Sequence, residues 1–158
     1  MRKQPFLLLI FLSIFSLFVN SAKAQEAGPI NQARLREILV QLGYIVKDLN
    51  TTPGKEKFEV KTTQGGLDVP ISYEISASTS YVWLTVFLGP APAEASILNA
   101  AMLKQNSKIQ PCMFYVTESG NLMMGLPVDN RGLNNALLRR YTDFITTKVV
   151  DTKAYWQK

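Results

Sequence analysis

The fold of this chain can be worked out from residues 81–88, which read YVWLTVFL. Side chains of a β-strand point alternately to the two faces of a sheet, and both alternating sets are apolar here. One face would receive Tyr81, Trp83 and Phe87, and the other would receive Val82, Leu84, Val86 and Leu88. Because both faces of such a strand require cover, we expect it to lie in the middle of a sheet.

Two strands with a single apolar face precede this stretch. Residues 57–62 alternate, and we expect Phe58 and Val60 to point inward. The Gly65-Gly66 pair forms a turn, and the next strand would direct inward Val69, Ile71, Tyr73 and Ile75. Pro70 in that strand has no amide hydrogen, so its amide position should face an unpaired edge or a bulge.

A second hairpin follows, with strands over residues 112–117 and 122–126 joined through Ser119-Gly120-Asn121. Its first strand is also apolar on both faces, which predicts a second central strand. Cys112 begins this strand and is the only cysteine of the chain. We expect a small buried apolar side chain there, and the alternatives are an intermolecular disulfide or a reactive thiol.

Two stretches on either side of the first three strands carry apolar residues at helical spacing. The first begins at the cap residue Asn31 and ends near Gly43. The second follows the turn residues 89–92 and runs to about Gln105. Their apolar stripes are Leu35, Ile38, Leu39 and Leu42 in the first, and Ile97, Leu98, Ala101 and Met102 in the second.

A third helix is predicted after the second hairpin, beginning at about Leu133 with Asp129 or Asn130 as its cap. Its stripe comprises Leu137, Leu138, Tyr141, Phe144 and Ile145. The elements therefore follow the order helix, three antiparallel strands, helix, two-strand hairpin, helix. This order predicts a single α+β domain in which three helices cover one face of a five-stranded antiparallel sheet.

The N-terminal residues have the pattern of a secretory signal peptide. Arg2 and Lys3 give a positive start, residues 6–19 form an apolar run, and Ala22-Lys23-Ala24 offers small residues to a signal peptidase. A helix of fourteen residues spans about 21 Å, short of the roughly 30 Å hydrocarbon core that an uncleaved anchor would cross. We therefore expect cleavage after Ala24 and export to the periplasm or the outside of the cell.

Removal of residues 1–24 changes the charge balance. Arg2, Lys3 and Lys23 leave with the signal peptide, so 14 of the 17 basic residues remain against 12 acidic residues. This near-neutral balance gives little support for a nucleic-acid partner or an anionic membrane partner. Residues 25–158 are enough for one domain, and no later apolar run predicts stable insertion in a membrane after cleavage.

The residue types leave little room for catalysis. The chain has no histidine, which removes the commonest metal ligand and the usual general base. A zinc site and a Ser/His or Cys/His nucleophile pair cannot be assembled. Four carboxylates lie near the predicted strands without a convergent pattern, namely Glu56, Glu59, Asp68 and Glu74. We expect no enzymatic activity, no metal and no cofactor.

The spacing of apolar residues and turns is similar to that of a known family. The similarity rests on Leu42-Gly43-Tyr44, residues 81–88, residues 98–106 with Ile109, and residues 112–127 leading into Leu133 and Leu137. Over residues 30–150 the chain resembles the type III secretion chaperone-like fold and, more loosely, the YbjN-type bacterial proteins described as sensory transduction regulators. The resemblance implies a small dimer that holds a partner polypeptide against apolar surfaces without enzymatic chemistry.

Apolar side chains are left over on the sheet face that the helices would not cover. These residues are Tyr81, Trp83, Phe87, Met113 and Tyr115. Aromatic side chains and methionine are good anchors, so we expect this face to meet a second subunit or an extended segment of a protein partner. The alternatives are a helix or the tail around Tyr155 and Trp156 folded over this face, and a carrier of a small apolar ligand or lipid with an enclosed cavity.

Overall fold

The computed structural model describes residues 28–91 and 95–157, and of residues 95–99 it describes the backbone alone. The predicted signal peptide with its cleavage after Ala24 therefore lies outside the described residues, as do the side chains of Ile97 and Leu98. Within the described residues, no helix has both the length and the apolar character needed to cross a membrane.

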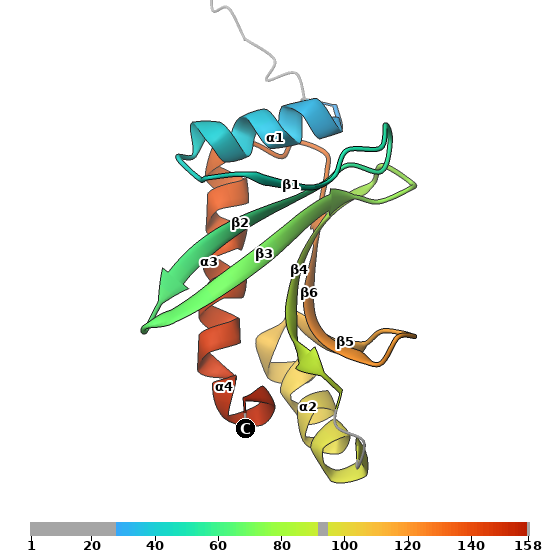
Figure 1. Ribbon diagram of the computed structural model, residues 1–158, viewed down its shortest axis with the longest axis vertical. Coiled ribbons are helices and arrows are strands. Elements are labelled where there is room, and N and C mark those ends of the chain that lie inside the picture. The colour runs from blue at the N-terminus through green and yellow to red at the C-terminus, as the bar shows by residue number, and fades with distance from the viewer. Residues whose placement is uncertain (1–27, 92–94, 158) are drawn as a thin grey trace, which may run out of the picture.

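Helices and strands follow one another along the chain as a mixed α+β domain, as predicted (Figure 1). In chain order they are α1 (Gln32–Gln41), β1 (Lys47–Asn50), β2 (Lys57–Gln64), β3 (Leu67–Ile75), β4 (Tyr81–Pro90), α2 (Ala95–Ile109), β5 (Met113–Val116), β6 (Asn121–Asp129), α3 (Asn135–Asp151) and α4 (Lys153–Trp156). Two of these elements, β1 and α4, were not predicted.

The strands form one antiparallel sheet in the order β1-β2-β3-β4-β6-β5. Within the described residues the sheet has six strands, so the prediction of five is wrong. The additional strand β1 lies at one edge, pairs with β2 and has all four residues exposed. A strand without a buried face carries no apolar alternation, which is why the sequence pattern did not reveal it. The four residues of α4 are likewise too few to show a helical period.

The second hairpin does not lie in the sheet as predicted. Strand β6 pairs with β4 on one side and with β5 on the other, so β5 is an edge strand and its predicted central position is wrong. Both of its faces are apolar for different reasons. Phe114 is buried beside α2, whereas Met113 and Tyr115 point to the opposite face of the sheet.

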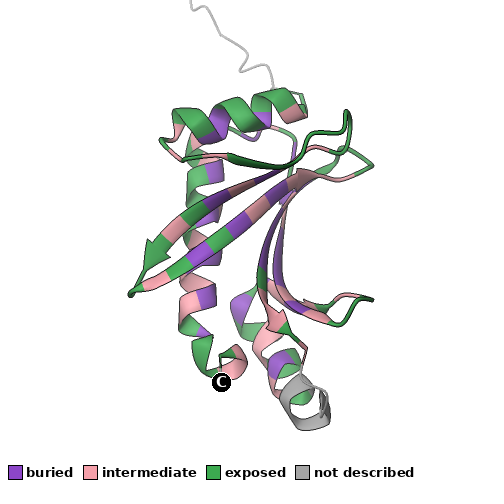
Figure 2. Ribbon diagram, in the orientation of Figure 1, coloured by how far each residue is buried: buried purple, intermediate pink, exposed green. Residues whose placement is uncertain are grey.

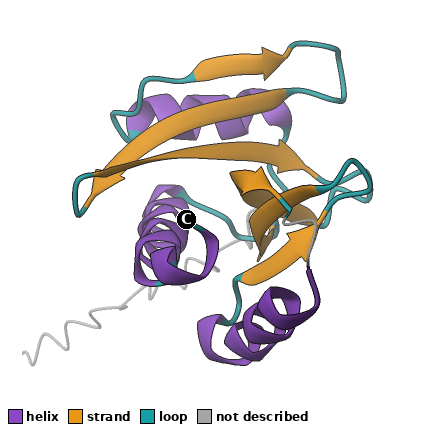
Figure 3. Ribbon diagram, turned by 60° about the horizontal axis from the view of Figure 1, so that its bottom comes forward, coloured by secondary structure: helices purple, strands orange, loops and turns teal. Residues whose placement is uncertain are grey.

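The apolar core lies between the sheet and the helices (Figure 2). The inward placement of alternate strand residues is confirmed for Phe58, Val60, Val69, Ile71, Tyr73, Val82, Leu84 and Val86. Two hydroxyl pairs join the sheet to α3, Tyr73 to Thr142 and Thr62 to Thr146, each with its oxygens 2.8 Å apart. We call the face of the sheet that carries these buried side chains the inner face, and the opposite face the outer face. Figure 3 shows α2 and α3 on the same side of the twisted sheet.

The first helix begins where the sequence predicted it, and the last helix does not. The Asn31 side chain accepts a hydrogen bond from the backbone N–H of Arg34 at 2.9 Å, so this cap is confirmed. For α3 the cap is Asn134, which accepts from the N–H of Leu137 at 3.0 Å. The predicted caps Asp129 and Asn130 are wrong, because Asp129 ends β6 and Asn130 is buried with other partners.

Pro70 lies in a part of β3 that pairs on one side. It is opposite Lys61 of β2, whereas the pairing of β3 with β4 begins at Ser72. A residue without an amide hydrogen therefore lies outside the ladder between β3 and β4, consistent with the predicted unpaired edge.

Candidate functional site

Four of the five predicted contact residues come together on the outer face, on either side of β6: Trp83, Phe87, Met113 and Tyr115. Residues opposite each other in antiparallel strands point to the same face. Phe87 of β4 is opposite Met123 of β6, which is opposite Tyr115 of β5. Along the same face, Thr85 of β4 is opposite Gly125 of β6, which is opposite Met113 of β5. Trp83 of β4 is opposite Pro127 of β6.

These side chains form a group that we call the outer apolar patch: Trp83, Phe87, Met113, Tyr115, Met123 and Pro127. Phe87 is 55% exposed, and the other five are half-buried. Tyr81, the remaining predicted residue, is 46% exposed and lies at the far end of β4 opposite Asp129. Sequence reasoning missed Met123 and Pro127, although they alternate with the buried residues of β6 and this period of two was available to find them.

The C-terminal tail does not lie over this patch. The Tyr155 hydroxyl accepts a hydrogen bond from Gln105 Nε2 at 2.7 Å, and Trp156 Nε1 donates to the Val149 carbonyl at 3.1 Å. Both aromatic rings pack against the core beside α2 and α3. The tail therefore belongs to the helical layer on the inner face.

Gly125 allows two aromatic rings to approach the backbone of β6 in the middle of the outer face. A Cβ atom at this position would lie 2.9 Å from Tyr115 Cε1 and 3.6 Å from Trp83 Cζ3. The Tyr115 ring therefore lies directly against the backbone of β6, in space that any other residue would occupy. The Trp83 ring approaches the same point from β4.

A hollow of about 270 Å³ lies beside these rings, and we call it the Glu74 hollow. Its lining comprises Glu74, Trp83, Thr85, Met113 and Tyr115. Glu74 belongs to β3 and is opposite Trp83 in the register of β3 with β4. The pKa of Tyr115 is raised, mainly because the phenol is partly buried and further because the Glu74 carboxylate is near.

The rest of the outer face, over β1, β2 and β3, is charged. Lysine and carboxylate side chains form three ion pairs between neighbouring strands: Lys47 with Glu59 at 3.6 Å, Lys57 with Glu74 at 3.4 Å, and Lys61 with Asp68 at 3.3 Å. Such exposed pairs contribute at most about 1 kcal/mol each to stability. Their effect is to keep this half of the face hydrated, so the outer face is divided into a charged half and an apolar half.

A second apolar hollow, of about 220 Å³, continues the patch around the edge strand. It is lined by Met102, Leu103, Phe114, Tyr115, Val116 and Leu122. Leu103 of α2 is 68% exposed and Val116 of β5 is 47% exposed. Tyr115 lines both hollows, so apolar surface extends from the outer face to α2.

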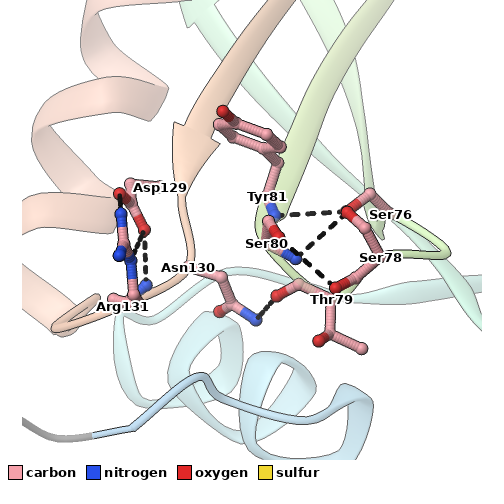
Figure 4. A network of polar contacts seen from close by, with 8 residues as sticks. All are labelled: Ser76, Ser78, Thr79, Ser80, Tyr81, Asp129, Asn130 and Arg131. Atoms are coloured by element: carbon pink, nitrogen blue, oxygen red, sulfur yellow. Dashed lines mark hydrogen bonds and ion pairs between the residues drawn. The ribbon is translucent and has the colours of Figure 1, made fainter.

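A polar network closes the end of the sheet near Tyr81 (Figure 4). The buried Asn130 side chain donates to the Thr79 carbonyl at 2.8 Å and to the Ile30 carbonyl at 3.0 Å. Arg131 binds both carboxylate oxygens of Asp129 and lowers the pKa of that carboxyl to about 2. The Asn130 hydrogen bonds fasten the β3–β4 turn to the segment before α1, which is a structural role.

The described residues contain no group of three cysteine, aspartate or glutamate side chains placed to hold a metal ion. Comparisons with family models, curated proteins and solved structures give no match to this chain. The resemblance to secretion chaperones and YbjN-type proteins therefore stays a prediction.

Proposed function

We propose that this protein is an exported, non-enzymatic binding module that holds a polypeptide, either a protein partner or a second copy of the chain, against its outer apolar patch. The observation that carries the proposal is the position of Phe87. Phe87 is more than half exposed at one end of an apolar group assembled from three strands. All the core-forming side chains of β4 point the other way, toward the helices.

The energetics favour association at this patch. Apolar surface removed from water contributes about 25 cal/mol per Å². Aromatic side chains bury a large area with few rotatable bonds, and methionine adapts its shape to an irregular partner surface. The charged half of the same face would then form a hydrated rim beside an apolar centre, which is the usual composition of a protein interface.

The test compares two exposed apolar side chains on different surfaces. Phe87→Ser removes the most exposed member of the patch, and Val40→Ser is the matched control, because Val40 is 50% exposed on α1. Assemblies are purified from the exported fraction and their masses measured by light scattering and mass spectrometry. We expect wild type and Val40→Ser to form the same complex and Phe87→Ser to be a folded monomer.

Two results would contradict the proposal. Wild-type protein could be monomeric with no bound polypeptide, or both serine variants could lose the complex equally. A bound lipid in a monomer would instead favour the alternative function, a periplasmic carrier of a small apolar ligand.

A further inference from the structure

The Glu74 hollow combines aromatic rings with a carboxylate, which limits the kinds of ligand that it can bind. Trp83 and Tyr115 present aromatic rings, and Glu74 presents a carboxylate at the border with the charged half of the face. An uncharged apolar ligand would displace water from the carboxylate without replacing its hydrogen bonds, which is unfavourable. An anion would be repelled.

A cation satisfies both kinds of group. Aromatic rings carry negative charge on their faces and attract a cation placed within about 6 Å of the ring centre. A carboxylate accepts charge-assisted hydrogen bonds, which are stronger than those between neutral groups. The planar guanidinium group fits best, because it stacks on an aromatic ring with its face and binds a carboxylate with its edge.

The structure places these groups close enough to act on one ligand. Glu74 and Tyr115 line the same hollow. The pKa of Tyr115 is raised, first by partial burial of the phenol and second by the nearby Glu74 carboxylate. Gly125 leaves room for the Tyr115 ring, whose Cε1 atom lies only 2.9 Å from the place that a Cβ atom would take.

Glu74 already has an intramolecular partner, and that partner leaves room for a ligand. Lys57 Nζ lies 3.4 Å from Glu74 Oε2, and the two side chains are 32% and 42% exposed. An ion pair this exposed is weak. A guanidinium group therefore competes with a flexible surface lysine for the carboxylate, and not with a buried salt bridge.

We propose that the Glu74 hollow binds the guanidinium group of an arginine side chain presented by the polypeptide partner. The inference rests on the proposed function and adds the chemistry by which the partner is recognised. Apolar residues of the partner would contact Phe87 and Met123, and an arginine would reach across Gly125 toward β3.

The test uses two small probes that differ in charge. Nα-acetyl-L-arginine amide carries the guanidinium, and Nα-acetyl-L-citrulline amide has nearly the same shape without the charge. Binding is followed by the NMR signal of the Trp83 indole N–H, with Trp156, the other tryptophan of the chain, as internal control. We expect a saturable shift at Trp83 with the arginine probe and at least fivefold weaker binding of the citrulline probe. Equal binding of both probes, or parallel shifts of both tryptophans, would overturn the inference.

Three variants test whether the Glu74 carboxylate binds the guanidinium group. Glu74→Gln should weaken binding of the arginine probe about fivefold, whereas Glu59→Gln, the same change in the neighbouring ion pair, should leave it unchanged. Lys57→Met removes the competitor of the ligand and should tighten binding roughly two- to fivefold. Unchanged binding in Glu74→Gln, or weaker binding in Lys57→Met, would contradict the proposed site.

The inference and the proposed function fail separately. If the arginine probe does not bind while Phe87→Ser still abolishes the complex, the arginine site is wrong and the partner-binding function stands. If the probe binds as expected while no complex depends on Phe87, the ligand chemistry of the hollow is supported and the proposed function is contradicted.

Discussion

Gly125 is the residue on which the shape of the outer apolar patch depends most. Its missing side chain lets the Tyr115 ring lie against β6 beside Trp83. The period of two in the sequence predicted that Trp83 and Tyr115 share a face, but it could not reveal that both rings approach Gly125. This arrangement depends on β6 lying between β4 and β5, which is a property of the sheet order and not of any local pattern.

A double-mutant cycle tests the contact at Gly125. The φ angle of Gly125 lies outside the left-handed region, so its backbone tolerates alanine, and Gly125→Ala should cost about 1 kcal/mol because the new methyl group displaces the Tyr115 ring. In a Tyr115→Ala background the same change should be neutral or stabilising, since alanine restricts the unfolded chain. Urea denaturation measures both steps. An equal cost in the two backgrounds would show that the ring does not cause it.

Cys112 gives a second prediction about a single residue. The structure confirms that the thiol is buried, and burial raises its pKa to about 12. A thiol reagent at pH 8 should therefore react with the native protein far more slowly than with the protein in urea. Burial favours the neutral thiol in the folded state. The contribution of this buried neutral thiol to the free energy of unfolding is therefore complete below about pH 8.5 and declines as the pH rises toward 12. Rapid labelling of the native protein would contradict the buried position and favour a reactive thiol.

Among the elements, the edge strand β5 and its neighbour α2 explain what sequence reasoning could not resolve. Asn106 of α2 accepts from the Phe114 N–H at 2.7 Å and donates to the Phe114 carbonyl at 3.2 Å. Its side chain therefore occupies the place of a neighbouring strand. This protects the open edge from pairing with another chain, so a partner is expected at the face of the sheet and not at the edge of β5.

Asn106→Ala tests the protection of this edge. The change leaves the Phe114 N–H and carbonyl without their side-chain partner, which should lower the free energy of unfolding by about 1–2 kcal/mol. It should also speed hydrogen exchange at the Phe114 amide. Asn106→Asp retains an acceptor for the N–H and loses the donor to the carbonyl, so it should slow exchange relative to Asn106→Ala. Equal exchange rates in all three proteins would mean that Asn106 does not protect the edge.

For the whole molecule, the sequence predicted the α+β class and the inward-facing side chains of β2, β3 and β4, because burial on one face imposes a regular period. It did not predict β1 or the edge position of β5, since exposed strands and strand order depend on long-range pairing. The division of the outer face into ion pairs over β1–β3 and aromatic side chains over β4–β5 also required the register.

Export is a prediction about the whole chain. We expect the protein in the exported fraction to begin at Gln25, with the mass of residues 25–158. Replacing Ala22 and Ala24 with arginine should block processing, because the signal peptidase requires small residues at these positions. The control, Lys23→Ala, changes the residue between them and should be processed normally. An exported protein that retains residues 1–24 would contradict the predicted cleavage.

Site-specific photo-crosslinking from residue 87 in the living cell tests the proposed function most directly. A photoreactive phenylalanine analogue at position 87 replaces an exposed ring of similar shape, and the same analogue at Val40 reports on the α1 surface. A polypeptide held on the outer face should give a discrete cross-linked band from position 87 that is absent from position 40. No polypeptide adduct from position 87, or the same adducts from both positions, would contradict the proposal that the outer apolar patch is a protein-binding surface.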